Sequence, residues 1–289
     1  MFYNAYNGTV KTADAEMDYI AFGYGESPLI MLPGLGDGLR TVKGMAIPFA
    51  FMYRQYAKDY RVYLMSRRKV MPSVFTTKDM ARDVYEAMKV LEIPKAYVVG
   101  VSQGGMIAQH LAIDYPQVVQ KLVLAVTLSR PNDTIQQVIG NWMEMAKQGD
   151  YKRIMIDTAE HSYSENYLKK MRKSYPILGS VGKPKSFDRF LVMAQACLTH
   201  DAHEELGRIK CPTLIIGGRQ DKIVTGEASE VLAEAISGSR LHMYTDFGHG
   251  AYEEGKDFLE MIADFLENDE MPDHCRRFHM DREDNEKLK

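Results

Sequence analysis

The chain has 289 residues, of which 45% are hydrophobic and 26% are charged, and its formal net charge at pH 7 is −3. This length is enough for one large domain with a sizeable core. The charge argues against a nucleic-acid-binding protein, because no long block of Lys and Arg accompanies it. The densest basic stretch, residues 67–69, is interpreted as the end of a loop and not as a phosphate site.

Targeting and cysteine signals are weak. The N-terminus lacks the basic and apolar regions of a signal peptide, and no apolar run reaches the roughly 18 residues of a membrane span. The three cysteines, Cys197, Cys211 and Cys275, are odd in number and have no CxxC spacing. This pattern argues against a disulfide framework and a zinc site. We therefore expect a cytoplasmic protein with no metal and no organic cofactor.

Apolar runs and amphipathic segments alternate through the first part of the chain. A glycine-rich loop at residues 33–38 interrupts the pattern. The segment that follows residue 76 predicts a helix, capped by Thr77, whose apolar residues recur every three or four positions. Another helix is predicted from about Gln103. The predicted strands are residues 17–21, 29–32, 61–65, 96–99 and 122–126.

The alternation breaks between residues 130 and 205, which predict helices only and are interpreted as a helical cap or lid. It resumes with strands at 213–216 and 241–244 and ends with an amphipathic helix. Alternating strands and helices predict an α/β fold, with a mostly parallel sheet and helices on both faces. We expect a core formed by residues 1–129 and 206–267, the cap at 130–205, and a charged tail at 268–289.

The stretch Gly100-Val101-Ser102-Gln103-Gly104 has the pattern G-x-S-x-G. It lies between a predicted buried strand and a predicted helix, which is the context that a nucleophile elbow requires. The glycines remove Cβ atoms that would collide with neighbouring backbone. The serine is thereby exposed at the carboxyl edge of the sheet, where open α/β folds bind ligands.

A serine nucleophile needs a base, and the base needs an acid that orients it. His249 lies in a glycine-lined loop after the strand at 241–244, and Asp221 follows the strand at 213–216. With Ser102 they give the chain order Ser, Asp, His that is expected for this architecture. Asp133 and Asp246 are the competing acids, and Asp246 is too close in sequence to His249 to orient it easily.

Two backbone N–H groups are expected to bind the developing oxyanion. One belongs to Gln103, directly after the serine, and the other to Leu35 in the glycine-rich loop, where Gly34 is expected to contact substrate. Such donors contribute about 2.7–4 kcal/mol each in a transition state. A phosphate-binding turn is the alternative for this loop, but the G-x-G-x-x-G spacing and the P-loop Lys are absent.

The chain resembles the α/β-hydrolase superfamily, in its lid-bearing, esterase-like branch. The resemblance rests on LPGLGDG at 32–38, on residues 76–125, on CPTLIIGGRQDKIV at 211–224 and on FGHGAYEE at 247–254. It implies Ser102 as nucleophile, Asp221 as acid and His249 as base, with the same two oxyanion donors. The chain departs from many relatives by having Pro33-Gly34 in place of His-Gly, and by lacking a glycine-rich run after Met65.

We therefore expect a serine hydrolase that cleaves an acyl bond, most simply of a small or medium carboxylic ester. An acyltransferase on the same triad and a non-catalytic small-molecule binder remain alternatives. The only partner expected is a small-molecule acyl substrate, with no nucleic acid and no membrane span, and a homo-oligomer stays open. Trp142 and Met143 of the cap are hypothesised to line an apolar acyl pocket, although ordinary helix packing also explains them.

Overall fold

The computed structural model describes residues 2–177, 179 and 182–268. Its centre is one eight-stranded sheet with the strand order β1-β2-β4-β3-β5-β6-β7-β8. β1 pairs antiparallel with β2, and β2 pairs antiparallel with β4, whereas the pairs from β4 to β8 are parallel. The strands are β1 (Tyr6–Lys11), β2 (Glu16–Phe22), β3 (Ser27–Leu32), β4 (Tyr60–Arg68), β5 (Ala96–Val101), β6 (Val119–Ala125), β7 (Thr213–Gly218) and β8 (Arg240–Tyr244).

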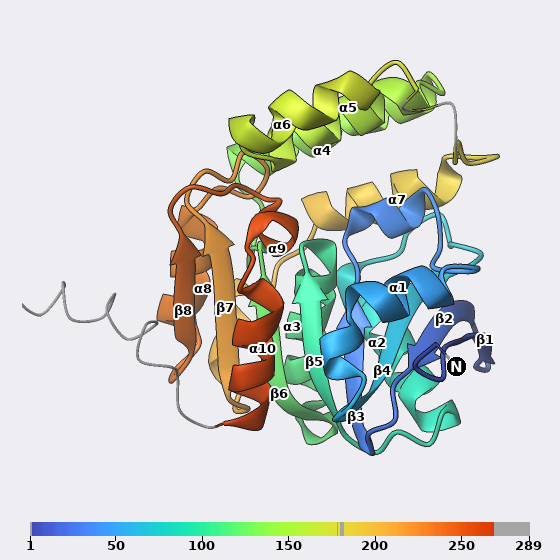
Figure 1. The fold of residues 1–289 in the computed structure, drawn as a ribbon, viewed down its shortest axis with the longest axis vertical. Helices are drawn as coiled ribbons and strands as arrows, with labels where there is room; N and C mark the ends of the chain where they lie inside the picture. The colour runs from blue at the N-terminus through green and yellow to red at the C-terminus, as the bar shows by residue number, and fades with distance from the viewer. Residues whose placement is uncertain (1, 178, 180–181, 269–289) are drawn as a thin grey trace, which may run out of the picture.

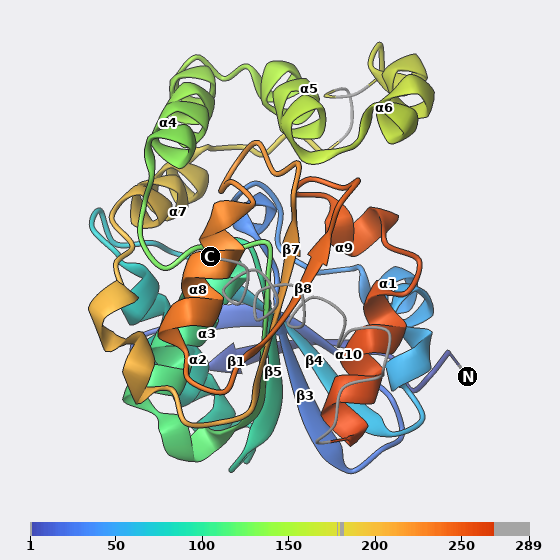
Figure 2. The same cartoon turned by 90° about the vertical axis from the view of Figure 1, so that its left-hand side faces the viewer.

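Helices cover both faces of this sheet (Figures 1 and 2). Successive strand residues point to opposite faces, so Ile30 and Leu124 enter the core on the side of α2, α3 and α8, while Met31 and Val123 enter the core on the side of α1 and α10. Strands buried on both sides read as continuous apolar runs, which is why β5 and β6 could be predicted. These helices are α1 (Ala46–Met52), α2 (Thr77–Val90), α3 (Gln103–Asp114), α8 (Glu227–Ala235), α9 (Ala251–Glu254) and α10 (Phe258–Glu267).

The segment between β6 and β7 is helical. It contains α4 (Asp133–Lys147), α5 (Tyr151–Ser162), α6 (Glu165–Met171) and α7 (Asp188–Leu198). Figure 1 shows α4, α5 and α6 as a layer above the sheet, with α7 lying between that layer and the core. The expected charged tail lies almost wholly outside the described residues, and so does Cys275.

Two local predictions differ from the structure. Thr76 and not Thr77 caps α2, because Asp79 stands three residues after Thr76 and completes a capping box with it. β4 continues to Arg68, whereas residues 67–69 are interpreted from the sequence as the end of a loop. Burial of these polar side chains is offset by partners from other elements, such as Asp83 of α2, whose carboxylate binds Arg68 at 2.5 and 2.7 Å.

Candidate functional site

Ser102 occupies a sharp turn between β5 and α3. Its backbone angles are φ 54° and ψ −119°, a region that non-glycine residues rarely adopt. The turn is fastened to β6 and the residues after it, because Ser102 N donates to the Ala125 carbonyl at 2.9 Å and Thr127 Oγ1 donates to the Ser102 carbonyl at 2.8 Å. A strained residue held in this way from several sides is typical of functional sites.

Glycines allow the close approaches at this turn. A Cβ atom on Gly104 would lie 1.9 Å from the Leu32 carbonyl oxygen, and a Cβ on Gly100 would lie 2.4 Å from the Gly104 carbonyl oxygen. Both distances are far below an ordinary contact, so neither position accepts a side chain without movement of the backbone. The two glycines therefore let strands β3 and β5 and the start of α3 pack at the spacing that presents the serine.

The structure brings Ser102, His249 and Asp221 together. With Nδ1 protonated, the His249 imidazole donates to Asp221 Oδ2 at 2.8 Å, and its Nε2 accepts from Ser102 Oγ at 2.9 Å. The second oxygen of Asp221 accepts from the backbone N–H groups of Ile223 and Val224 at 2.8 and 2.9 Å. This fixes the carboxylate, and the neighbouring acid Asp246 is exposed.

The loop that carries His249 is held by the helical segment. Gly250 N donates to the carbonyl of Ser162, the last residue of α5, at 2.7 Å. On the other side, a Cβ atom on Gly218 would lie 2.2 Å from the Gly248 carbonyl oxygen. The histidine is 6% exposed, so its ring has little freedom to leave the serine.

The segments that carry Leu35 and Gln103 both lie beside the serine. Leu35 begins the short 3₁₀ helix η1 (Leu35–Gly38), and a Cβ on the preceding Gly34 would lie 3.4 Å from Ser102 Cβ. Gln103 is the first residue of α3, where a backbone N–H has no acceptor within the helix. The segments that carry the two predicted donors thus lie beside Ser102, and the role of Leu35 and Gln103 as oxyanion donors stays a prediction.

The predicted cap residues are packed rather than free. Trp142 is 5% exposed, and its Nε1 donates to Asp157 Oδ2 at 2.6 Å. Met143 is half-buried against the same core. These contacts explain both side chains by helix packing, and a role in substrate binding stays a prediction.

Three charged residues near η1 were not recognised as part of the site from the sequence. Asp37 of η1 is buried and forms an ion pair with Arg189 of α7, and Arg67 of β4 donates to the Pro33 carbonyl. The sequence held one indirect indication of these residues. Pro33 stands where many relatives have a histidine, so the loop lacks the side-chain support that this histidine would give.

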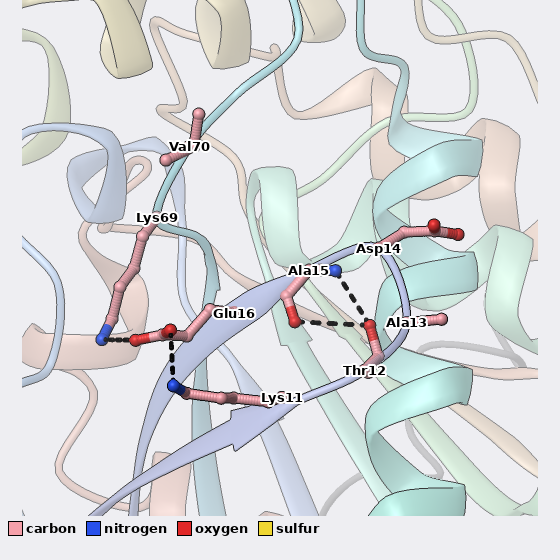
Figure 3. Close-up of a pocket in the computed structure, with 8 residues that line it drawn as sticks. All are labelled: Lys11, Thr12, Ala13, Asp14, Ala15, Glu16, Lys69 and Val70. Carbon is pink, nitrogen blue, oxygen red and sulfur yellow. Dashed lines mark hydrogen bonds and ion pairs between the residues drawn. The ribbon is translucent and has the colours of Figure 1, made fainter.

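A surface hollow of about 420 Å³ lies elsewhere, at the turn between β1 and β2 (Figure 3). Its charged groups satisfy one another, since Glu16 pairs with Lys11 at 3.3 Å and with Lys69 at 2.5 Å. Ser102, Asp221 and His249 do not line this hollow. Over the part of the chain that the structure describes, no three His, Cys, Asp or Glu side chains are arranged to hold a metal ion, and no helix has the length and apolar character to cross a membrane.

Comparison with known proteins agrees with this fold. A family model described as alpha/beta hydrolase fold matches residues 27–154, which include the serine turn, and a second model, described as TAP-like protein, matches residues 195–277. The chain belongs to the α/β-hydrolase superfamily. A solved α/β hydrolase, MGS-M2 from a Medee basin deep-sea metagenome library, superposes with a TM-score of 0.81 at 21% identity, covering 92% of this chain and 99% of that one.

Several proteins that are similar in sequence to this chain are named hydrolases. The 3-oxoadipate enol-lactonase 2 of Acinetobacter baylyi is 24% identical and is matched over 82% of this chain and 88% of its own length. The 2-hydroxy-6-oxononadienedioate/2-hydroxy-6-oxononatrienedioate hydrolase 1 of Pseudomonas putida is 26% identical over 89% of this chain and 95% of its own length. The chain is accordingly a hydrolase of the superfamily.

Proposed function

We propose that this protein is a serine hydrolase that cleaves an acyl bond, with a small or medium carboxylic ester as its substrate class. The observation that carries the proposal is the continuous hydrogen-bond chain from Ser102 Oγ through His249 to Asp221, with distances of 2.9 and 2.8 Å. Both distances lie within the range that proton transfer in a nucleophile–base pair requires.

In the proposed first step, Ser102 Oγ attacks the acyl carbonyl carbon while its proton passes to His249 Nε2. Asp221 holds the imidazole in the reactive tautomer and stabilises its cation. The carbonyl oxygen becomes an oxyanion that accepts from the N–H groups of Leu35 and Gln103. The C–O bond to the leaving alcohol then breaks, and His249 returns its proton to that alcohol.

The second step regenerates the serine. His249 takes a proton from water, the resulting hydroxide attacks the acyl-enzyme, and the acid product leaves as Ser102 recovers its proton. The reaction consumes one water and one ester and yields one acid and one alcohol. Gly34 is the proposed substrate contact nearest the nucleophile. Trp142 and Met143 are proposed to bound the acyl chain from the cap, a role supported only by their place above the sheet.

The test is turnover of a series of 4-nitrophenyl esters, from acetate to octanoate, by the wild type and by Ser102→Ala. We expect the wild type to hydrolyse the shorter esters, and the variant to lose more than about 10³-fold in kcat. Circular dichroism verifies that the variant is folded. Equal rates for both proteins would refute the nucleophile. An ester product formed with an added alcohol would indicate acyl transfer, and stabilisation by ligands without turnover would indicate a binding protein.

A further inference from the structure

A buried cluster of charged side chains supports the loop that carries Leu35. Asp37, two residues further on, is 5% exposed. Its Oδ1 accepts from Ser66 Oγ at 2.5 Å, and its Oδ2 accepts from the Arg67 backbone N–H at 2.9 Å and forms the ion pair with Arg189. The carboxylate therefore ties η1 to the end of β4 and to helix α7.

Arg189 completes this connection with its remaining donors. Its Nε donates to the Arg68 carbonyl at 3.0 Å, and its Nη2 donates to the Arg67 carbonyl at 3.1 Å. Its Nη1 donates to the backbone carbonyl of Asp37. One guanidinium of the helical segment thus contacts both the backbone and the side chain of η1, a geometry that the planar group of arginine favours.

Helix α7 also contacts the segment that carries the second proposed oxyanion donor. Gln103 Nε2 donates to the carbonyl of Met193, one helical turn beyond Arg189, at 2.7 Å. A Cβ atom on Gly38 would lie 2.9 Å from Phe190 Cα, so the end of η1 packs directly on the helix backbone. A single helix of the segment between β6 and β7 therefore holds both halves of the proposed oxyanion hole.

A second buried cation, Arg67, lies next to the same loop. Arg67 is buried beside Asp37, and its Nη2 donates to the carbonyl of Pro33, next to Gly34. Burial lowers the pKa of Arg67 to about 10, so the group stays charged at neutral pH. The Asp37 carboxylate pairs with the guanidinium of Arg189, whereas the guanidinium of Arg67 donates to the backbone carbonyls of Met65 and Pro33. Desolvation makes such buried ions weak contributors to stability, which leaves positioning as the role that explains them.

We propose that Arg189 is a positioning residue for the oxyanion hole, acting through Asp37 on the Leu35 loop in place of the side-chain support that Pro33 cannot give. The inference rests on the proposed function. The positioning role predicts that the ion pair between Arg189 and Asp37 lowers the free energy of the transition state and has little effect on binding of the substrate in its ground state. A loop displaced by about 1 Å costs roughly 10²-fold in rate.

The test compares Arg189→Gln with the wild type on a 4-nitrophenyl ester and on its O-aryl thionoester, whose C=S sulfur accepts weaker hydrogen bonds. We expect kcat on the ester to fall about 10²-fold with KM within about twofold. The ester-to-thionoester rate ratio should fall toward unity, and affinity for a trifluoromethyl ketone should fall in parallel with kcat. Arg189→Lys, which keeps the cation, should recover part of each loss.

Arg68→Gln is the matched control, because it removes a buried guanidinium from the carboxylate of Asp83 on α2 but keeps the Arg68 backbone carbonyl that Arg189 contacts. It should lower stability but leave the ester-to-thionoester ratio at the wild-type value. Should Arg189→Gln fail to fold, Asp37→Asn provides the same comparison, because the amide has the size of the carboxylate but removes the ion pair with Arg189. An unchanged ratio in a folded Arg189 or Asp37 variant, with the wild type active, would overturn the positioning role alone. A wild type without turnover would instead refute the proposed function.

Discussion

Replacement of Gly104 by alanine tests the geometry of the serine turn. The added Cβ would lie 1.9 Å from the Leu32 carbonyl oxygen and 2.6 Å from the carbon of the same group. It is thus about 1.5 Å closer than an ordinary contact of 3.4 Å, and the obstacle is backbone of a central strand. Overpacking costs about 1–3 kcal/mol when side chains can adjust, so we expect a loss of about 3 kcal/mol or more here.

Gly140→Ala is the control for this prediction. Gly140 lies inside α4, and a Cβ there meets nothing within 4 Å. Alanine in an open helical position is favoured over glycine by about 0.5–1 kcal/mol, so this variant should gain stability. Urea unfolding followed by circular dichroism measures both changes. If the two variants changed the free energy of unfolding by similar amounts, the close packing at the serine turn would be refuted.

Three further changes have defined outcomes. Asp221→Asn should lower kcat by about 10⁴-fold, because an amide no longer holds the reactive tautomer of His249. The control variant Asp246→Asn should leave esterase kinetics unchanged. A small effect of Asp221→Asn on kcat would contradict the role of Asp221 as the acid. Burial lowers the pKa of His200 in the folded protein to about 3. As the pH falls below about 6.5, the His200 imidazole is therefore protonated in the unfolded chain but not in the folded protein. The free energy of unfolding should then fall by about 1.4 kcal/mol per pH unit. Thermal unfolding between pH 6.5 and 5 should show a shallower slope for His200→Gln, and an equal slope would reject the burial argument. Trp142→Phe removes the 2.6 Å hydrogen bond from the indole N–H to Asp157. It should lower the free energy of unfolding, measured in urea, by about 1–2 kcal/mol. Asp157→Asn should lower this free energy by no more than that amount.

The sequence was sufficient to predict the parts of the fold that follow local rules. The buried strand before Ser102, the glycines around it and the helix after it are adjacent in the chain, so periodicity and turn chemistry could identify them together. Asp221 and His249 could be chosen because carboxyl ends of parallel strands meet at one edge of a sheet. The spacing of apolar residues likewise predicted the buried face of α2.

Other features had no local signal. Asp37 and Arg189 are 152 positions apart, and nothing near either residue indicates its partner. The polar residues 67–69 were interpreted as the end of a loop, although Arg67 and Arg68 belong to β4. Their partners lie on other elements, and only the folded chain offsets the cost of burying these side chains. Strand β1 was missed since it is an edge strand with a single buried residue, Val10, and so lacks the alternation that reveals a half-buried strand.

Covalent labelling with a fluorophosphonate probe, read by peptide mass spectrometry, shows whether Ser102 is an activated nucleophile, because the probe reacts with an activated serine whatever the substrate is. The proposed triad predicts modification of the wild type at Ser102 alone, with labelling lost in Ser102→Ala and strongly slowed in Asp221→Asn. A folded wild type that stays unlabelled, or that is labelled equally after the serine is removed, would contradict it.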